Sequence, residues 1–225
     1  MDLFTEKNIS PMLIAQMQEP FNDPDWIYEL KLDGCRCIAY LEEDRSILRN
    51  KRNMELLPRF PELKDIHTSV KDRCILDGEL VVMINGVPEF YELQKRTLMT
   101  NPVKISMAAG LLPASFVAYD CLQVNDRILL DTPLMERKVI LQELVQENER
   151  IAVSRYIEEK GTELYELTVH DNLYLSFTEP NLAERYEKIQ EVLNQIHSEM
   201  EGMKDIEKIG TIINPGRRML IITTI

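Results

Sequence analysis

The chain is organised around one stretch, Glu29-Leu30-Lys31-Leu32-Asp33-Gly34-Cys35-Arg36. β-Branched and aromatic residues flank it, so we predict a strand over 26–31, a turn at Asp33-Gly34 and a second strand over 35–41. Alternate side chains of a strand share a face, and we therefore expect Glu29, Lys31 and Asp33 to project into one site. A lysine held between two carboxylates in a partly desolvated site is a candidate nucleophile.

Outside this stretch, apolar runs and apolar periodicity predict further strands and helices that do not alternate regularly. Strands are predicted over 45–50, 74–83, 115–122 and 151–156, and in a hairpin made by 209–213 and 219–225. Helices are predicted over 91–99, 134–147, 162–167 and 181–203. The apolar stripe of the second helix is predicted to contain Leu134, Val139, Leu141, Leu144 and Val145. This order of elements indicates an α+β fold with mostly antiparallel sheets.

Bulk composition excludes several classes of protein. No apolar run approaches the roughly 20 residues that span a bilayer, and no secretory signal is visible, so we expect a cytoplasmic protein without a membrane partner. The four cysteines show no CxxC spacing and are expected to be reduced, buried or half-buried thiols. The net charge of −12 argues against a general nucleic-acid coat protein but leaves room for a local basic groove.

A nucleotide site in this chain would have to be built from side chains on strands, because neither GxxxxGK[ST] nor GxGxxG occurs. Such a site needs a nucleophile, cations for phosphate oxygens, a carboxylate for metal or ribose, and an aromatic plate for the base. The candidates, in that order, are Lys31; Arg36 with Lys51 or Arg52; Glu79; and Tyr119. Each alone also fits a plain structural reading, as a cross-strand ion pair, a strand kink or a core residue.

Taken together and in order, these residues resemble those of one family. The first stretch matches the ExKxDGxR nucleophile motif of covalent nucleotidyltransferases, and residues 8–170 resemble the adenylation (nucleotidyltransferase) domain of bacterial ATP-dependent DNA ligases. The other matching segments are Arg59-Phe60-Pro61-Glu62-Leu63, Leu76-Asp77-Gly78-Glu79-Leu80-Val81, Phe90-Tyr91-Glu92-Leu93-Gln94, Tyr119-Asp120-Cys121-Leu122 and Leu134-Met135-Glu136-Arg137. The resemblance implies an antiparallel-sheet, ATP-grasp-like adenylation domain.

The resemblance also implies a reaction and a set of site residues. Lys31 would attack the α-phosphate of ATP and carry AMP on Nζ, and the adenylate would then pass to the 5′-phosphate of a nick in duplex DNA during repair or recombination. Glu29 would lie beside the adenine pocket, Arg36 at the ribose or phosphate, and Tyr119 on the adenine face. Glu79 would contact the ribose or Mg²⁺. The implied ATP-binding set is Glu29, Leu30, Lys31, Arg36, Lys51, Glu79 and Tyr119, with Lys51 standing where the family usually has arginine.

The resemblance ends at about Leu167-Thr168-Val169-His170. The EG[IVL]xxK and KxK segments and the OB-fold domain of the family are not recognisable beyond that point. We therefore expect an incomplete adenylation domain over 1–170 and an unassigned helix with a hairpin-like tail over 171–225. A second polypeptide could complete the pocket. Two alternatives stay open: a catalytically impaired nucleotide-binding or partner-binding remnant of a ligase, and another covalent nucleotidyltransferase of the RNA-ligase or capping type.

Overall fold

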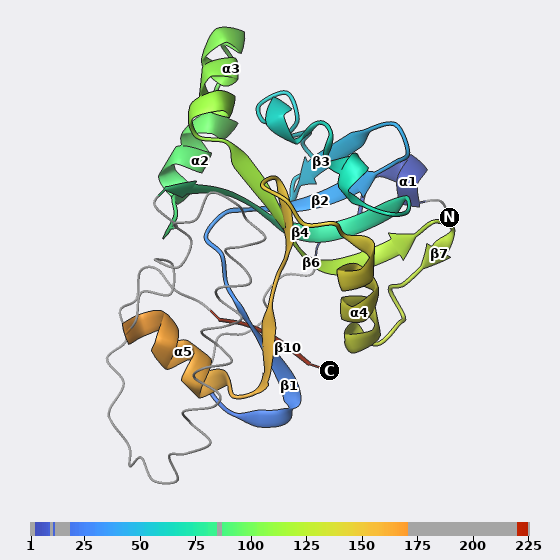
Figure 1. The fold of residues 1–225 in the computed structure, drawn as a ribbon, viewed down its shortest axis with the longest axis vertical. Coiled ribbons are helices and arrows are strands. Elements are labelled where there is room, and N and C mark those ends of the chain that lie inside the picture. The colour runs from blue at the N-terminus through green and yellow to red at the C-terminus, as the bar shows by residue number, and fades with distance from the viewer. Residues whose placement is uncertain (1–2, 10, 12–18, 85–86, 171–219, 225) are drawn as a thin grey trace.

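The computed structural model describes residues 3–9, 11, 19–84, 87–170 and 220–224, which form two β-sheets with helices around them (Figure 1). The predicted helix over 181–203 and the predicted strand over 209–213 lie outside the described residues.

The larger sheet has seven strands in the order β3-β2-β4-β6-β7, with β5 paired to β4 and β8 paired to β6. All of these pairs are antiparallel except β6 with β8. Its strands are β2 (Cys35–Leu41), β3 (Ser46–Asn50), β4 (Cys74–Ile84), β5 (Val87–Pro88), β6 (Ala114–Val124), β7 (Arg127–Ile128) and β8 (Ile151–Val153). The predicted α+β class with mostly antiparallel sheets is thus confirmed.

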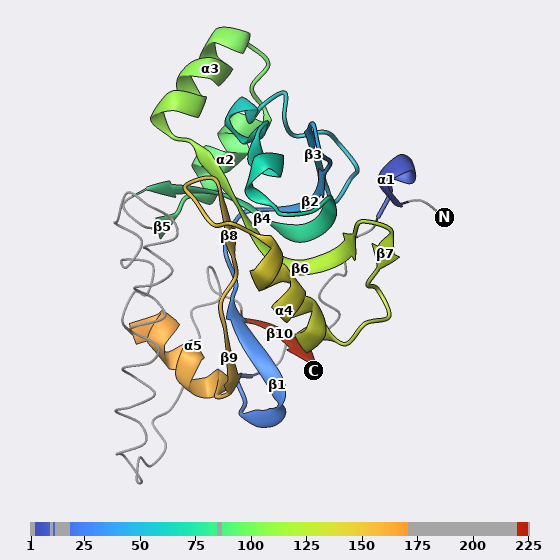
Figure 2. The same cartoon turned by 45° about the vertical axis from the view of Figure 1, so that its right-hand side comes forward.

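The smaller sheet has three antiparallel strands in the order β10-β1-β9. They are β1 (Asp23–Leu30), β9 (Tyr156–Glu159) and β10 (Leu220–Thr224). In Figures 1 and 2 this sheet and helix α5 (Gly161–His170) form the end of the molecule away from α3 (Pro102–Leu111).

The two strands that flank Asp33-Gly34 belong to different sheets, so they do not form a hairpin with each other. β1 ends at Leu30, and the segment 31–34 crosses from the smaller sheet to the larger one. A Cβ atom on Gly34 would lie 2.3 Å from the carbonyl oxygen of Leu80, so the crossing segment passes closer to β4 than any other residue type would allow. Close approach to a neighbouring strand, rather than a tight turn, explains the glycine.

A second crossing divides the predicted strand 151–156. β8 pairs with β6 in the larger sheet and β9 pairs with β1 in the smaller one, with Ser154 and Arg155 between them. The amide of Ser154 still donates to the carbonyl of Ala118 on β6 at 2.7 Å. The two sheets are therefore joined by two short connections, residues 31–34 and residues 154–155 (Figure 2).

One face of the larger sheet carries the main apolar core. That core includes Leu48, Leu63, Leu76, Phe116 and Leu141, all with 0% of their surface exposed. Two short 3-10 helices (Pro61–Leu63 and Ile66–Ser69), α2 (Phe90–Thr97) and α4 (Leu134–Leu144) contribute to it. Alternate positions of β4 (Cys74, Leu76, Leu80 and Val82) and of β6 (Ala114, Phe116 and Ala118) produce this face.

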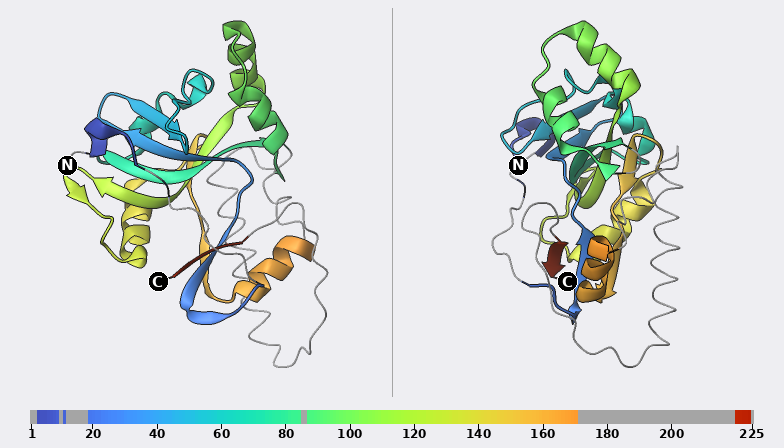
Figure 3. Two further views of the ribbon diagram at one scale, coloured as in Figure 1. Left: turned by 180° about the vertical axis from the view of Figure 1, so that it is seen from behind. Right: turned by 90° about the vertical axis from the view of Figure 1, so that its left-hand side faces the viewer.

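The helices follow the predicted positions with two differences. α2, α4 and α5 are confirmed, although α4 ends at Leu144, and the short α1 (Leu3–Glu6) and α3 were not predicted. Asn101 caps α3 by accepting hydrogen bonds from the amides of Val103 and Lys104. α3 has no buried residue and protrudes from the sheet in Figure 3, so no apolar periodicity marks it.

The stripe predicted for α4 is wrong at Val139, which is 50% exposed. Lys138 is buried on that helix instead, with 1% of its surface exposed.

All four cysteines are free thiols, three buried and Cys35 half-buried, as predicted. Among the described residues, no helix is both long and apolar enough to cross a membrane.

Candidate functional site

Three charged residues share one face of the larger sheet. β2 and β4 pair with Arg36 opposite Glu79 and Ile38 opposite Asp77. Directly opposite residues of an antiparallel pair project to the same side, so Arg36, Asp77 and Glu79 lie together. We call these three residues the polar strip.

The polar strip lies between two apolar clusters on the same sheet face. Along β4 the side chains of Ile75, Asp77, Glu79 and Val81 alternate with those that face the main core. Ile75 belongs to a cluster with Leu3, Phe4, Ile38, Tyr40 and Leu122. Val81 belongs to a cluster with Tyr28, Leu32, Val117, Ala152 and Leu164. Apolar packing on both sides therefore fixes the strip and partly removes it from water.

A β-bulge brings Tyr119 to the strip. Asp77 pairs with Asp120 and Gly78 pairs with Ala118, which leaves Tyr119 as the extra residue on β6. Gly78 allows this close pairing, since a Cβ there would lie 2.4 Å from the carbonyl oxygen of Val117. The Tyr119 hydroxyl donates to Oε2 of Glu79 at 3.4 Å.

Arg36 connects the strip to Tyr119. Its Nε and Nη2 donate to the two carboxylate oxygens of Asp77 at 2.7 and 2.5 Å, a bidentate pair. Its Cζ lies 4.5 Å from the centroid of the Tyr119 ring, within the range of a cation–π contact. Burial raises the pKa of Asp77, while the guanidinium acts in the opposite direction.

Glu79 has the most perturbed carboxyl group of the site. Burial raises the pKa of Glu79 to about 7, although Lys31, Arg36 and the Tyr119 hydroxyl each lower it. A carboxyl group that titrates near neutral pH, beside a candidate nucleophile, is typical of functional sites. The charge of Lys31 lowers the pKa of Glu79, so the lysine ammonium lies near that carboxyl group. Lys31 itself belongs to the segment 31–34 that connects the two sheets.

Lys31 thus meets the strip from the segment that connects the two sheets and not from a strand. It is half-buried one residue beyond the end of β1, so the expectation that Glu29, Lys31 and Asp33 share a strand face is wrong beyond Leu30. Leu30 is half-buried and packs against the cluster around Tyr28.

Glu29 is 5% exposed and engages a residue that the sequence analysis did not single out. Nζ of Lys138, on α4, lies 2.6 Å from Oε1 of Glu29 and 2.6 Å from the carbonyl oxygen of Tyr119. One signal could have found it: Lys138 stands four residues after Leu134 and three before Leu141, on the buried face of the helix.

Lys51 is exposed directly after β3, at the edge of this group. Burial and the charge of Glu79 raise the pKa of Cys35, whereas Lys51 lowers it, so both charged groups lie near that thiol. The structure therefore brings Lys31, Arg36, Glu79 and Tyr119 together, and places Lys51 at the periphery.

The described residues contain no group of three or more His, Cys, Asp or Glu side chains that could hold a metal ion. Asp77 is occupied by Arg36, which leaves Glu79 as the carboxylate of the strip that could bind a cation. Mg²⁺ commonly uses one or two carboxylates together with substrate phosphates, and a single glutamate fits that pattern.

Three comparisons bear on this site. A model of the family described as ATP dependent DNA ligase domain matches residues 11–173. DNA ligase C1 of Mycolicibacterium smegmatis is 34% identical over 170 residues, which are 72% of this chain and 49% of that protein. The SPbeta prophage-derived DNA ligase-like protein LigB of Bacillus subtilis is 30% identical over 166 residues, or 73% of this chain and 58% of that one. The chain spans about half the length of these curated relatives.

Among solved structures, a mycobacterial DNA ligase D complexed with ATP and MES is similar to this chain with a TM-score of 0.58. The identity is 21%, and the match covers 72% of this chain and 50% of that chain. At this level of identity the comparison concerns the fold alone, and it agrees with an adenylation-domain fold of the α+β class.

Proposed function

Because the chain belongs to the ATP-dependent DNA ligase domain family, we propose that Lys31 reacts with ATP to form a lysyl-AMP intermediate that serves the sealing of nicked duplex DNA. One observation carries this proposal. The lysine of the ExKxDGxR motif lies beside Glu79. Glu79 accepts a hydrogen bond from the Tyr119 hydroxyl, and the charge of Arg36 lowers its pKa. Four residues from separate segments thus meet in one place, and they supply the amine, cation, carboxyl group and aromatic ring to which we assign adenylate transfer.

In the proposed first step, Nζ of Lys31 loses its proton to solvent and forms a bond to the α-phosphorus of ATP. The bond from that phosphorus to the bridging oxygen breaks, and pyrophosphate leaves with the electron pair. Arg36 is held by Asp77, so its guanidinium is oriented before nucleotide arrives and supplies positive charge near the ribose or phosphates. Tyr119 offers its ring to the base.

Glu79 is the residue that we assign to Mg²⁺ or to the ribose hydroxyls. When bound, the metal neutralises charge on the triphosphate and on departing pyrophosphate. Near neutral pH the carboxyl group of Glu79 is divided between protonated and ionised forms. Hydroxyl donors or a cation favour the ionised form, so nucleotide binding and ionisation of Glu79 support each other.

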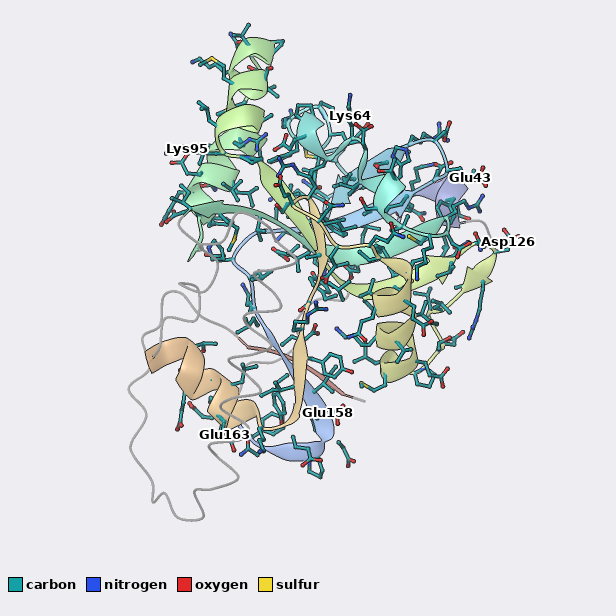
Figure 4. The ribbon with its side chains drawn as sticks, in the orientation of Figure 1. Glu43, Lys64, Lys95, Asp126, Glu158 and Glu163 are labelled. Atoms are coloured by element: carbon teal, nitrogen blue, oxygen red, sulfur yellow. The ribbon has the colours of Figure 1, made fainter. Side chains whose placement is uncertain are left out.

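The lysyl-adenylate is tested with ATP labelled at the α-phosphate in the presence of Mg²⁺. We expect acid-labile label on the wild-type chain and none on Lys31→Ala. The matched control is Lys95→Ala, since Lys95 is exposed on α2 and lies away from β1 in Figure 4. Label on Lys31→Ala, or its absence from wild type at high enzyme concentration, contradicts the proposal.

The second step is tested by adding nicked duplex DNA to the labelled protein. Transfer of label to the 5′-phosphate followed by sealing supports a role in DNA repair or recombination. Label without transfer indicates a half-reaction. Within the chain we assign the nucleotide site to residues 1–170, and groups beyond the described residues, in this chain or in a second polypeptide, would supply the EGxxxK and KxK functions.

A further inference from the structure

Lys138 makes contacts that connect three separate elements. It is 1% exposed on α4, and its ammonium donates to Glu29 at the end of β1 and to the main chain of Tyr119 on β6. Nζ also lies 5.9 Å from the ring centroid of Tyr156 on β9. The contact with Glu29 joins residues 109 positions apart in the sequence. A single cation therefore touches both sheets, at the two residues, Glu29 and Tyr119, that we assign to the base.

Anchoring α4 to the sheet does not explain this arrangement. Arg137, the preceding residue, already holds α4 to β6 through Nε and Nη2, which donate to the carboxylate of Asp120 at 2.8 and 2.9 Å. A buried ion pair is in general no more stabilising than apolar residues of similar volume. A second anchor made from a buried lysine and a buried glutamate thus points to a task beyond stability.

We infer that Lys138 is a positioning residue that sets the base selectivity of the nucleotide site by holding Glu29 and the main chain of Tyr119 in a fixed relation. The inference rests on the proposed function, in which Glu29 lies beside the base and Tyr119 lies against its face. Lys138 touches neither ATP nor the reacting atoms and acts through these two residues.

The selectivity follows from hydrogen-bond chemistry. Paired with an ammonium, Glu29 is a carboxylate and only accepts hydrogen bonds. Lys138 engages Oε1 of Glu29, and we assign Oε2 as the acceptor for the base. Adenine offers an exocyclic amine as a donor, whereas guanine carries a carbonyl oxygen at the equivalent ring position. A carboxylate fixed by Lys138 therefore accepts adenine and repels guanine.

The test compares self-labelling by ATP and by GTP in wild type, Lys138→Met, Lys138→Arg and Glu29→Gln. We expect Lys138→Met to raise the KM for ATP about tenfold and to reduce the ATP:GTP preference by a similar factor, as losing one oriented bond to a charged group implies. The maximal labelling rate should stay within about twofold, since Lys31 and the polar strip are untouched. Lys138→Arg keeps the charge and should recover part of the preference.

A matched control comes from the same helix. Arg137→Met removes an ion pair to β6 but contacts neither Glu29 nor the Tyr119 carbonyl, so it should lower thermal stability without changing the ATP:GTP preference. The double variant Glu29→Gln with Lys138→Met should have the same ATP:GTP preference as Glu29→Gln alone, because Lys138 sets the preference through the Glu29 carboxylate. Additive effects on the preference overturn the inference.

The outcomes separate this inference from the proposed function. If the wild-type chain acquires no label from ATP, the proposed function is wrong. If the wild-type chain is labelled and the ATP:GTP preference is unchanged in Lys138→Met, the proposed function stands and only the role inferred for Lys138 is wrong. If Lys138→Met does not fold, Glu29→Gln and Lys138→Arg decide, and a wild-type preference in Glu29→Gln overturns the inference.

Discussion

Glu79 is the residue of the strip whose charge state depends most on its surroundings. Burial, opposed by Lys31 and Arg36, moves its pKa from 4.5 to about 7. The raised value means that the folded chain favours the protonated form, so the folded state binds more protons than the unfolded state between these two pH values. The contribution of Glu79 to stability is then fully present below pH 4.5 and is lost as the pH rises through 7.

The predicted loss of stability with rising pH can be measured directly. The free energy of unfolding of wild type, relative to Glu79→Gln, should fall by about 3 kcal/mol between pH 4.5 and pH 7. Urea unfolding at a series of pH values measures it, with Glu92→Gln on the surface of α2 as the control. A difference between wild type and Glu79→Gln that is flat with pH, or that rises, means that the carboxyl group is not desolvated as described.

Gly34 decides how closely the crossing segment approaches β4. Gly34→Ala places a methyl group 2.3 Å from the Leu80 carbonyl oxygen, so backbone must move. We expect a loss of about 1–3 kcal/mol in the free energy of unfolding, the usual cost of overpacking, and slower formation of lysyl-AMP because Lys31 lies in the same segment. Urea unfolding and the labelling rate measure the two effects.

Gly110 supplies the comparison for that variant. A Cβ atom on Gly110, in α3, meets nothing within 4 Å. Gly110→Ala should therefore raise stability by about 0.5–1 kcal/mol, as expected for alanine in an exposed helix. Equal losses in the two variants would mean that contact with β4 is not the cause.

At the scale of elements, the sequence predicts most strands and helices but not how they combine. β4 and β6 are long strands that are mostly apolar, and α4 carries Leu134, Leu141 and Leu144 at buried positions, so each can be found locally. The assignment of β1 and β2 to different sheets depends on contacts between β1 and strands β9 and β10, which are remote in the chain. Local propensity carries no information about such partners.

The same distinction separates the site residues. Lys31, Arg36, Glu79 and Tyr119 could be chosen because a spaced motif marks each of them. No such motif marks Lys138. Its spacing from Leu134 and Leu141 places it on the buried face of α4, but a lysine in a helix is ordinarily exposed, and its burial here depends on Glu29 from another sheet. α3 was missed for a related reason, since it has no buried face to produce a pattern.

At the scale of the whole molecule, nucleotide binding should be separable from the attack by Lys31. The contacts proposed for base, ribose and phosphate come mainly from the larger sheet, and Lys31→Ala leaves them in place. ATP with Mg²⁺ at about 100 times its dissociation constant should stabilise Lys31→Ala by about 2.7 kcal/mol, which corresponds to a rise in Tm of roughly 5–10 °C.

Differential scanning fluorimetry measures that shift. Replacing both Arg36 and Glu79, by Arg36→Met and Glu79→Gln, should abolish it while the protein without nucleotide still unfolds cooperatively. A shift that survives this double replacement places the nucleotide somewhere other than the polar strip.

The two crossings between the sheets have a mechanical consequence. Lys31, the proposed nucleophile, directly follows β1 of the smaller sheet, whereas Arg36, Glu79 and Tyr119 belong to strands of the larger sheet. A small rotation of one sheet against the other would then alter the line along which Nζ approaches phosphorus, and the contacts of Lys138 with Glu29 and with the Tyr119 carbonyl oppose such a rotation. Substitutions at Ser154 or Arg155, on the second crossing, would then change the rate of lysyl-AMP formation from positions outside the set of residues that we assign to the nucleotide.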